Sequence, residues 1–275
     1  MLEAVSKRLV LVCDTMGPSD LVNSLYGLGK FHFQQDGGTT AGLLSASVRR
    51  HLDACSFDQM SQVLSSLIRL GSTNQPLVSA VVGRVLREPL TCCSFQGLVN
   101  LMVAFARFGV RPIKNVWGVL ADEVCVRLTE SSYSRSDLLA AIRAYSVMHV
   151  GTAHANLFQS VSAALKVGPP LLPEEVCMYV KACSRAQFRE VEMLTLCGSS
   201  LRQHSFCSLS DSALLELFSG LDKLGVDMDE LSGELKNRGV SVPTKSAVVS
   251  TWLRPAVARK PVAESKSLRR RKWTW

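Results

Sequence analysis

The stretch SFQGLVNLMVAFARFGV, residues 94–110, decides the fold. Its large apolar residues recur at the spacing of one helical face; they are Leu98, Leu101, Phe105 and Phe108. Ser94 suits the N-cap, because its hydroxyl can accept a backbone N–H of the first turn. Gly109 suits the left-handed residue that often ends a helix. The stretch therefore predicts one amphipathic helix with a defined start and stop.

The same pattern occurs about six times in the chain. We take the last apolar residue before each stop as an anchor; the anchors are Leu28, Leu70, Phe108, Met148, Ala186 and Leu224. The intervals between them are 42, 38, 40, 38 and 38 residues. In the first copy the stop is Gly29, and Pro18 stands where the other copies have an apolar residue, so we expect that helix to start later. A shared spacing of this kind predicts a repeat array.

Two further features recur in step with the anchors. Four residues before each anchor is a small residue, which allows a neighbouring helix to approach closely; these residues are Ser24, Ser66, Ala104, Ala144, Ala182 and Gly220. Fourteen residues before four of the anchors is a serine expected to cap the helix, and Gln59 completes a capping box with the first; the serines are Ser56, Ser94, Ser134 and Ser210.

A second apolar segment follows each of these helices, at residues 41–55, 75–88, 113–130, 153–167, 189–206 and 227–238. Each is long enough for a helix, so the repeat is a helix pair. We predict an all-α fold, a right-handed α-solenoid of about six helix pairs over residues 1–240, followed by a basic extended tail over residues 241–275. The period exceeds the roughly 34 residues of tetratricopeptide repeats and fits the HEAT and armadillo range.

Composition and motifs argue against several classes of protein. No run of about 18 uncharged apolar residues occurs, so no membrane span is predicted. The start, MLEAVSKRLVLVCD, is interpreted as a helix that packs on the first repeat rather than as a signal peptide. No phosphate-binding loop or catalytic motif occurs, and the five histidines are scattered. We expect no enzyme, no cofactor, no metal and no small-molecule substrate, and we interpret the nine cysteines as free thiols.

The charge of the chain is concentrated in its tail. Residues 1–240 carry 22 Lys and Arg against 22 Asp and Glu, whereas residues 241–275 carry nine basic residues and one acid, Glu264. A short helix over residues 244–254 is expected there, then an extended arm. Basic residues neutralise phosphates and Trp stacks on bases, so we predict RNA contacts in the tail from Arg254, Arg259, Lys260, Lys266, Arg269, Arg270, Arg271, Lys272 and Trp273. The alternative is a solubilising tail.

A second basic set is spaced by the repeat. Positions one and five residues before the anchors should share an exposed helix face, and several are basic. This ladder consists of Arg69, Arg107, Arg143, Lys181 and Arg185. A ladder with nearly one cation per repeat could follow a phosphate backbone. The alternative is that these are ordinary charged positions on exposed helix faces.

Four segments carry a resemblance to a known group of proteins: LVNSLYGLGKF, MSQVLSSLIRLG, LVNLMVAFARFGV and LLELFSGLDKLGV. Their pattern, L-x-x-x-L/F-x-x-L/F-G, resembles the octotricopeptide and heptatricopeptide repeats of organellar RNA-associated proteins, including those that precede RAP domains. The resemblance implies RNA binding in mitochondria, or alternatively plastids, within large ribonucleoprotein assemblies. No RAP domain is evident, and the array is short and electrically neutral.

These departures favour a structural subunit over a free-standing RNA reader. The leading hypothesis is a non-catalytic component of the mitochondrial ribosome, in contact with ribosomal RNA and neighbouring proteins. Two alternatives stay open. One is a stand-alone organellar RNA-processing or RNA-stability factor, and the other is a HEAT-like protein scaffold that binds no RNA.

Overall fold

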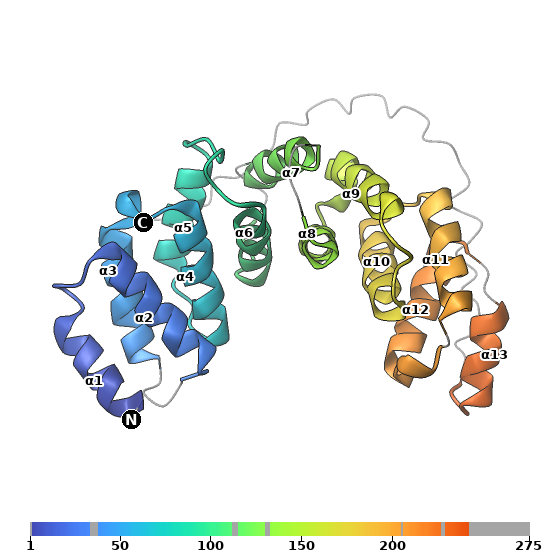
Figure 1. Ribbon diagram of the computed structural model, residues 1–275, viewed down its shortest axis with the longest axis horizontal. Helices are drawn as coiled ribbons and strands as arrows, with labels where there is room; N and C mark the ends of the chain where they lie inside the picture. Colours follow the sequence, from blue (N-terminus) through green and yellow to red (C-terminus); the bar gives the residue numbers. More distant parts are fainter. Residues whose placement is uncertain are drawn as a thin grey trace, which may run out of the picture.

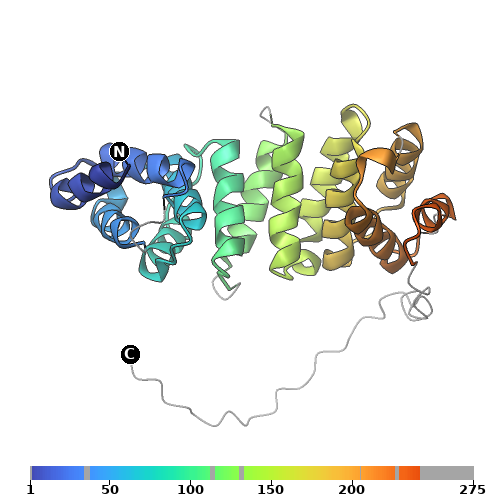
Figure 2. The same ribbon diagram turned by 90° about the horizontal axis from the view of Figure 1, so that it is seen from below.

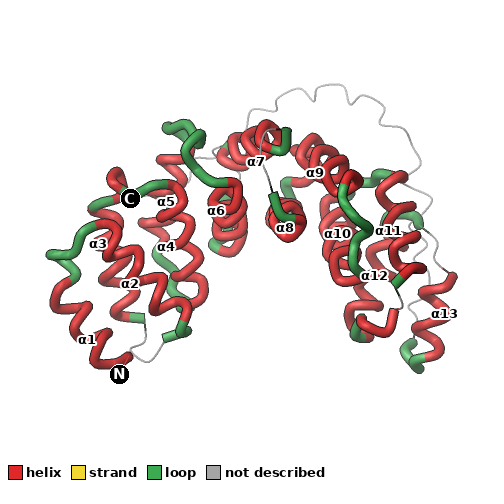
Figure 3. The backbone as a smooth tube through the Cα atoms, in the orientation of Figure 1, coloured by secondary structure: helices red, strands yellow, loops and turns green. Residues whose placement is uncertain are grey.

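The protein is built from helices alone wherever its structure is described. The computed structural model describes residues 2–33, 38–111, 115–129, 133–204, 206–226 and 229–241. These ranges form thirteen α-helices and three short 3-10 helices, with no strand (Figures 1 and 3). The all-α prediction is therefore confirmed for this part of the chain. Within it, no helix is long and apolar enough to cross a membrane.

The helices alternate between two rows. The inner row consists of α2 (Pro18–Lys30), α4 (Phe57–Arg69), α6 (Phe95–Arg107), α8 (Arg135–Val147), α10 (Pro173–Ala186) and α12 (Asp211–Lys223). The outer row consists of α1 (Leu2–Val12), α3 (Thr39–Arg50), α5 (Gln75–Val85), α7 (Val116–Arg127), α9 (Ala155–Val167), α11 (Val191–Gln203) and α13 (Asp229–Asn237). The 3-10 helices are η1 (Leu52–Ala54), η3 (Gly151–His154) and η4 (Phe206–Ser208).

The two rows curve together into an arch. Each inner helix packs against the next, from α2 on α4 to α10 on α12, and the outer helices α3 to α11 follow the same order. The inner row lines the concave side of the arch (Figure 1), and the view from below shows the inner helices α6 and α8 standing side by side (Figure 2). This alternation is consistent with the predicted helix pairs, each with its first helix in the inner row.

The predicted N-caps form as expected. The Ser56 hydroxyl accepts the Gln59 backbone N–H at 3.2 Å, and the Gln59 side-chain oxygen accepts the Ser56 backbone N–H at 2.8 Å. Ser94, Ser134 and Ser210 each accept a first-turn N–H in the same way. Because each cap fixes the first helical residue, the inner helices start in step.

The helix ends also follow one geometry. After α6, Gly109 has φ +64°, and the Val110 N–H donates to the Phe105 carbonyl at 2.9 Å. This left-handed residue with its two reverse-turn hydrogen bonds satisfies carbonyls of the last helical turn. The left-handed residues that end the six inner helices are His32, Gly71, Gly109, His149, Gln187 and Gly225.

The first repeat corrects the prediction made from its sequence. Gly29 is not a stop: α2 continues through Lys30, and His32 is the left-handed residue, with φ +50°. The first anchor is therefore Phe31 rather than Leu28, and the left-handed residues are spaced by 39, 38, 40, 38 and 38 positions. With this anchor, Pro18 is the first helical residue, thirteen before the anchor, as Phe57 is in the second repeat. The expected later start of this helix was wrong.

Three arginines, in α5, in α7 and just after α13, link the second helix of a pair to the turn that precedes the first. Each guanidinium binds two main-chain carbonyls just before an inner helix and also pairs with a glutamate four residues away in the chain. The sets are Arg84 with Leu52 and Cys55, Arg127 with Leu90 and Cys93, and Arg238 with Phe206 and Leu209. We call these residues the arginine clamps. They add donors to the carbonyls of these turns, of which Leu52, Leu90 and Phe206 also accept a backbone N–H within the turn.

Candidate nucleic-acid interface

The predicted ladder lies on the inner row of helices. Arg69, Arg107 and Arg185 are exposed at the C-terminal ends of α4, α6 and α10, and Arg143 is exposed within α8. Because these helices run in the same direction and pack side by side, equivalent positions form rows along the arch. All of them belong to the row of helices that lines the concave side (Figure 1).

Lys181 differs from the other members of the ladder. It is half-buried, and its Nζ forms an ion pair with the Glu216 carboxylate on α12, the next inner helix. Its charge is therefore already compensated by a protein carboxylate. Lys181 acts first as a link between neighbouring helices, a role that the sequence did not suggest because its partner lies 35 residues away.

The helix dipole explains why some positions of the ladder are basic, without any bound ligand. The last turn of an α-helix carries partial negative charge, which favours a cation there. Five of the six inner helices end with a basic residue: Lys30, Arg69, Arg107, Arg185 and Lys223. Arg69, Arg107 and Arg185 thus have a structural reason to be basic.

Arg143 has no such reason. It lies outside the last turn of α8, a helix that has no basic residue at its end. Its guanidinium, like those of Arg107 and Arg185, has no hydrogen-bonding or ionic partner among the described residues. An exposed, uncompensated cation on a middle helix of the inner row is available to an anionic partner. Arg143 is the member of the ladder that most specifically suggests a binding role.

The surroundings of Arg143 limit the kind of contact it can make. Val147 on α8 is 43% exposed, and Val103 on α6, Ala140 on α8 and Met178 on α10 are half-buried. None of these positions is aromatic. Since bases stack on aromatic side chains when single strands are bound, this part of the inner face can neutralise phosphates but offers no stacking platform.

The predicted residues of the tail lie outside the described residues. These are Arg254, Arg259, Lys260, Lys266, Arg269, Arg270, Arg271, Lys272 and Trp273, together with the short helix expected over residues 244–254. The structure describes the chain up to Ser241, just after α13 and its left-handed Gly239.

The arginine clamps were missed by the sequence analysis. Arg84 is buried, with 7% of its surface exposed, and Arg127 and Arg238 are largely covered. The signal that could have revealed them is an arginine and a glutamate four residues apart in or at the end of three outer helices. These cations serve the fold, so they do not count toward a basic surface. Among the described residues, no three His, Cys, Asp or Glu side chains gather as a metal site would require.

Comparison with known proteins adds no relative. No protein-family model matches the chain, and no curated protein matches it.

Proposed function

We propose that this protein is a non-catalytic, RNA-binding component of an organellar ribonucleoprotein assembly, and we take the mitochondrial ribosome as that assembly. In this proposal the helix pairs form a right-handed α-solenoid that contacts neighbouring proteins and one RNA segment. The tail enters RNA and anchors the subunit. The mitochondrion is the proposed location, with the plastid as the alternative.

The separation of charge along the chain carries this proposal. The helical array is neutral over residues 1–240, while residues 241–275 hold nine basic residues against Glu264. A neutral array attracts no polyanion by its net charge, whereas a short run of Arg and Lys binds phosphates and releases their counterions. Basic arms of this kind often become ordered only on a large partner. Together these features favour a subunit that is anchored by its tail.

The inner face supports a secondary contact with RNA. Arg107, Arg143 and Arg185 lie on three successive inner helices and present three uncompensated guanidinium groups. Neighbouring helices pack about 8–10 Å apart, so a backbone that crosses the arch meets one cation per helix. Without aromatic neighbours, this contact positions the backbone and does not read bases.

RNA affinity tests the proposal directly. The binding of a 30-nucleotide single-stranded RNA is measured at several salt concentrations for the full chain and for two variants. In the tail variant, Arg269, Arg270, Arg271 and Lys272 become Gln; in the inner-face variant, Arg107, Arg143 and Arg185 become Gln. Arg87→Gln, at an exposed arginine that follows α5, is the control.

We expect the tail variant to bind much more weakly and to lose about 3 units of the salt slope, because each phosphate contact to a single strand contributes about 0.7. The inner-face variant should lose less, and the control should bind as the full chain does. A loss confined to the inner-face variant would favour the stand-alone RNA factor. No RNA binding by the full chain at low salt would favour the protein scaffold, which the aliphatic neighbours of Arg143 also fit.

A further inference from the structure

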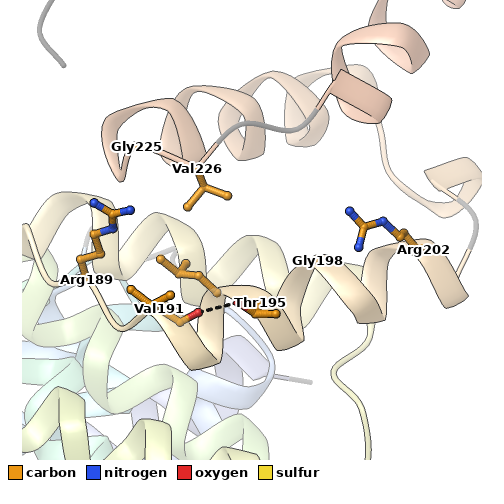
Figure 4. A pocket seen from close by; sticks show the side chains of 8 residues that line it. Arg189, Val191, Thr195, Gly198, Arg202, Gly225 and Val226 are labelled. Atoms are coloured by element: carbon orange, nitrogen blue, oxygen red, sulfur yellow. Dashed lines mark hydrogen bonds between the residues drawn. The ribbon is translucent and has the colours of Figure 1, made fainter.

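A cleft of about 300 Å³ separates α11 from the turn that joins α12 to α13 (Figure 4). One face of α11 forms its floor, with Val191 and Leu194, and Val226 lies opposite. Arg189 and Arg202 stand at its two ends (Figure 4). The cleft thus has an aliphatic centre between two cations.

The end of the helical array explains why this cleft is open. Each outer helix from α3 to α9 is flanked by the next outer helix. The last one, α13, has nine residues and packs on α12. It also reaches α11 through an ion pair in which Arg202 Nε lies 3.0 Å from a Glu230 carboxylate oxygen. The face of α11 that an outer helix would otherwise cover is therefore left partly open.

The centre of the cleft exposes aliphatic surface. Val191, the first residue of α11, is 64% exposed, and Leu194 lies buried beneath it. The Thr195 hydroxyl donates to the Val191 carbonyl at 2.9 Å, so it is already engaged within the helix. An exposed aliphatic residue in a concave site gains free energy when an apolar side chain covers it.

The charge of the cleft is positive. Among the described residues that line it there is no carboxylate. The Arg189 guanidinium lies next to Gly225 and has no hydrogen-bonding or ionic partner among the described residues, while Arg202 is shared with Glu230. The two arginines lie at opposite ends of a 13-residue helix, about 20 Å apart along its axis. An extended peptide of about six residues spans that length.

We propose that this cleft binds an acidic peptide segment of a neighbouring protein, with an aliphatic side chain over Val191 and Leu194 and a carboxylate at each arginine. The inference deepens the protein-contacting role proposed above by naming the chemistry of the partner. RNA fits less well, because none of the described residues that line the cleft is aromatic and could stack on a base. The chain's own residues 242–275 fit less well because they are strongly basic.

Peptide selection on the isolated full chain tests this without RNA or an organelle. A random dodecapeptide library is selected on the immobilised protein, and selected peptides are synthesised with a fluorescent label. Their affinity is measured by fluorescence anisotropy for the full chain, Arg189→Glu, Val191→Ser and the control Arg87→Glu. Arg87 is also an exposed arginine, but it follows α5 and does not line the cleft. Circular dichroism verifies that each variant is folded.

We expect the selected peptides to carry Asp or Glu on both sides of an aliphatic residue. Arg189→Glu should weaken their binding about tenfold or more, since charge reversal places like charges together, and Val191→Ser should weaken it severalfold. Arg87→Glu should leave it unchanged. The inference is overturned if no peptide is enriched, if the enriched peptides lack acidic residues, or if Arg189→Glu binds them normally.

Two further outcomes would show that the cleft binds something other than an acidic peptide of a partner protein. Displacement of the peptides by a 12-nucleotide oligouridylate would assign the cleft to RNA. Stronger peptide binding after deletion of residues 242–275 would assign it to the chain's own tail. A failure of the RNA-binding proposal would leave peptide binding unchanged, so the two ideas fail separately.

Discussion

Gly29 on α2 lies so close to Ser66 on α4 that a Cβ atom on residue 29 would be 2.9 Å from the Ser66 Cβ atom. Gly220 on α12 meets α10 in a similar way, since an added Cβ would be 2.8 Å from a Val180 methyl carbon. Small residues in the inner row thus set how closely successive helices pack. Gly29 has this packing role, and His32 ends the helix in its place.

Gly29→Ala is expected to lower the free energy of unfolding by about 1–3 kcal/mol, because the added methyl forces α2 away from α4. Urea denaturation followed by circular dichroism measures the change. Gly27→Ala is the matched control: it lies in the same helix, has nothing within 4 Å of an added Cβ, and should stabilise the helix slightly. Equal effects of the two substitutions would contradict the packing role of Gly29.

His32→Gly is expected to raise the free energy of unfolding by about 0.5–1 kcal/mol. His32 has φ +50°, a conformation that is strained for a residue with a Cβ and free for glycine. The reverse substitution, Gly109→Ala at φ +64°, should destabilise the protein by a similar amount. Destabilisation by His32→Gly in the same denaturation assay would show that α2 does not end there.

Arg84→Ala is expected to destabilise the protein by about 2–4 kcal/mol. The buried guanidinium binds the Cys55 carbonyl at 2.9 Å and the Leu52 carbonyl, and pairs with Glu88. Its removal takes away this donor from the Cys55 carbonyl and the buried cation from Glu88, while the Leu52 carbonyl keeps only the Cys55 N–H at 3.1 Å. Arg87→Ala, at an exposed position three residues on, should change stability by less than about 0.5 kcal/mol. Similar melting temperatures for the two variants would argue against the clamp.

The adjacent cysteines Cys92 and Cys93 should react very differently with iodoacetamide. Cys92 is exposed, whereas burial raises the pKa of the Cys93 thiol to about 12. Because the thiolate is the reactive form, Cys93 should stay unmodified at pH 8 while Cys92 is alkylated. Mass spectrometry of the digested protein measures both sites, and denatured protein provides the control in which both react. Rapid labelling of native Cys93 would contradict its burial.

His154 is expected to make stability depend on pH. Desolvation lowers the pKa of its imidazole below the ordinary value of 6.5, which the nearby Asp122 carboxylate opposes. The ring lies edge-on to Tyr145, with centroids 5.5 Å apart. The unfolded chain therefore binds more protons than the folded one just below pH 6.5, so stability falls as the pH is lowered through that range.

His154→Gln removes this dependence. On acidification from pH 7.5 to 5.5, the free energy of unfolding should fall less in the variant than in the natural chain. The difference between the two decreases should be under about 1 kcal/mol. Urea denaturation at each pH measures the difference. A larger loss of stability in the variant would reverse the sign of the argument.

Local signals explain which parts of the fold the sequence predicts. Apolar spacing, the serine caps and the glycine stops after α4, α6 and α12 depend on residues a few positions apart, and they identify these helices correctly. The first repeat was misaligned because glycine serves two purposes. It ends helices and it also allows close packing, and Gly29 does the second while His32 does the first.

Contacts between distant residues account for what the sequence does not predict. The exposure of the ladder follows from helical periodicity, so it could be anticipated. The pairing of Lys181 with Glu216 and the binding of main-chain carbonyls by Arg84 depend on the spacing between helices. The same holds for the cleft beside α11, which exists because the last outer helix is short.

Sedimentation of the protein from cells tests the central claim most directly. Extracts prepared at mild salt are treated with ribonuclease or left untreated, and the full chain is compared with a version ending at Ser241, which keeps α13 and the hydrogen bonds of its end. The proposal predicts that the full chain sediments with a large particle that collapses on ribonuclease treatment, and that the shortened chain does not join it. If sedimentation is unchanged by ribonuclease and by the loss of residues 242–275, the proposal of an RNA-anchored subunit is contradicted. The protein would then be a protein scaffold.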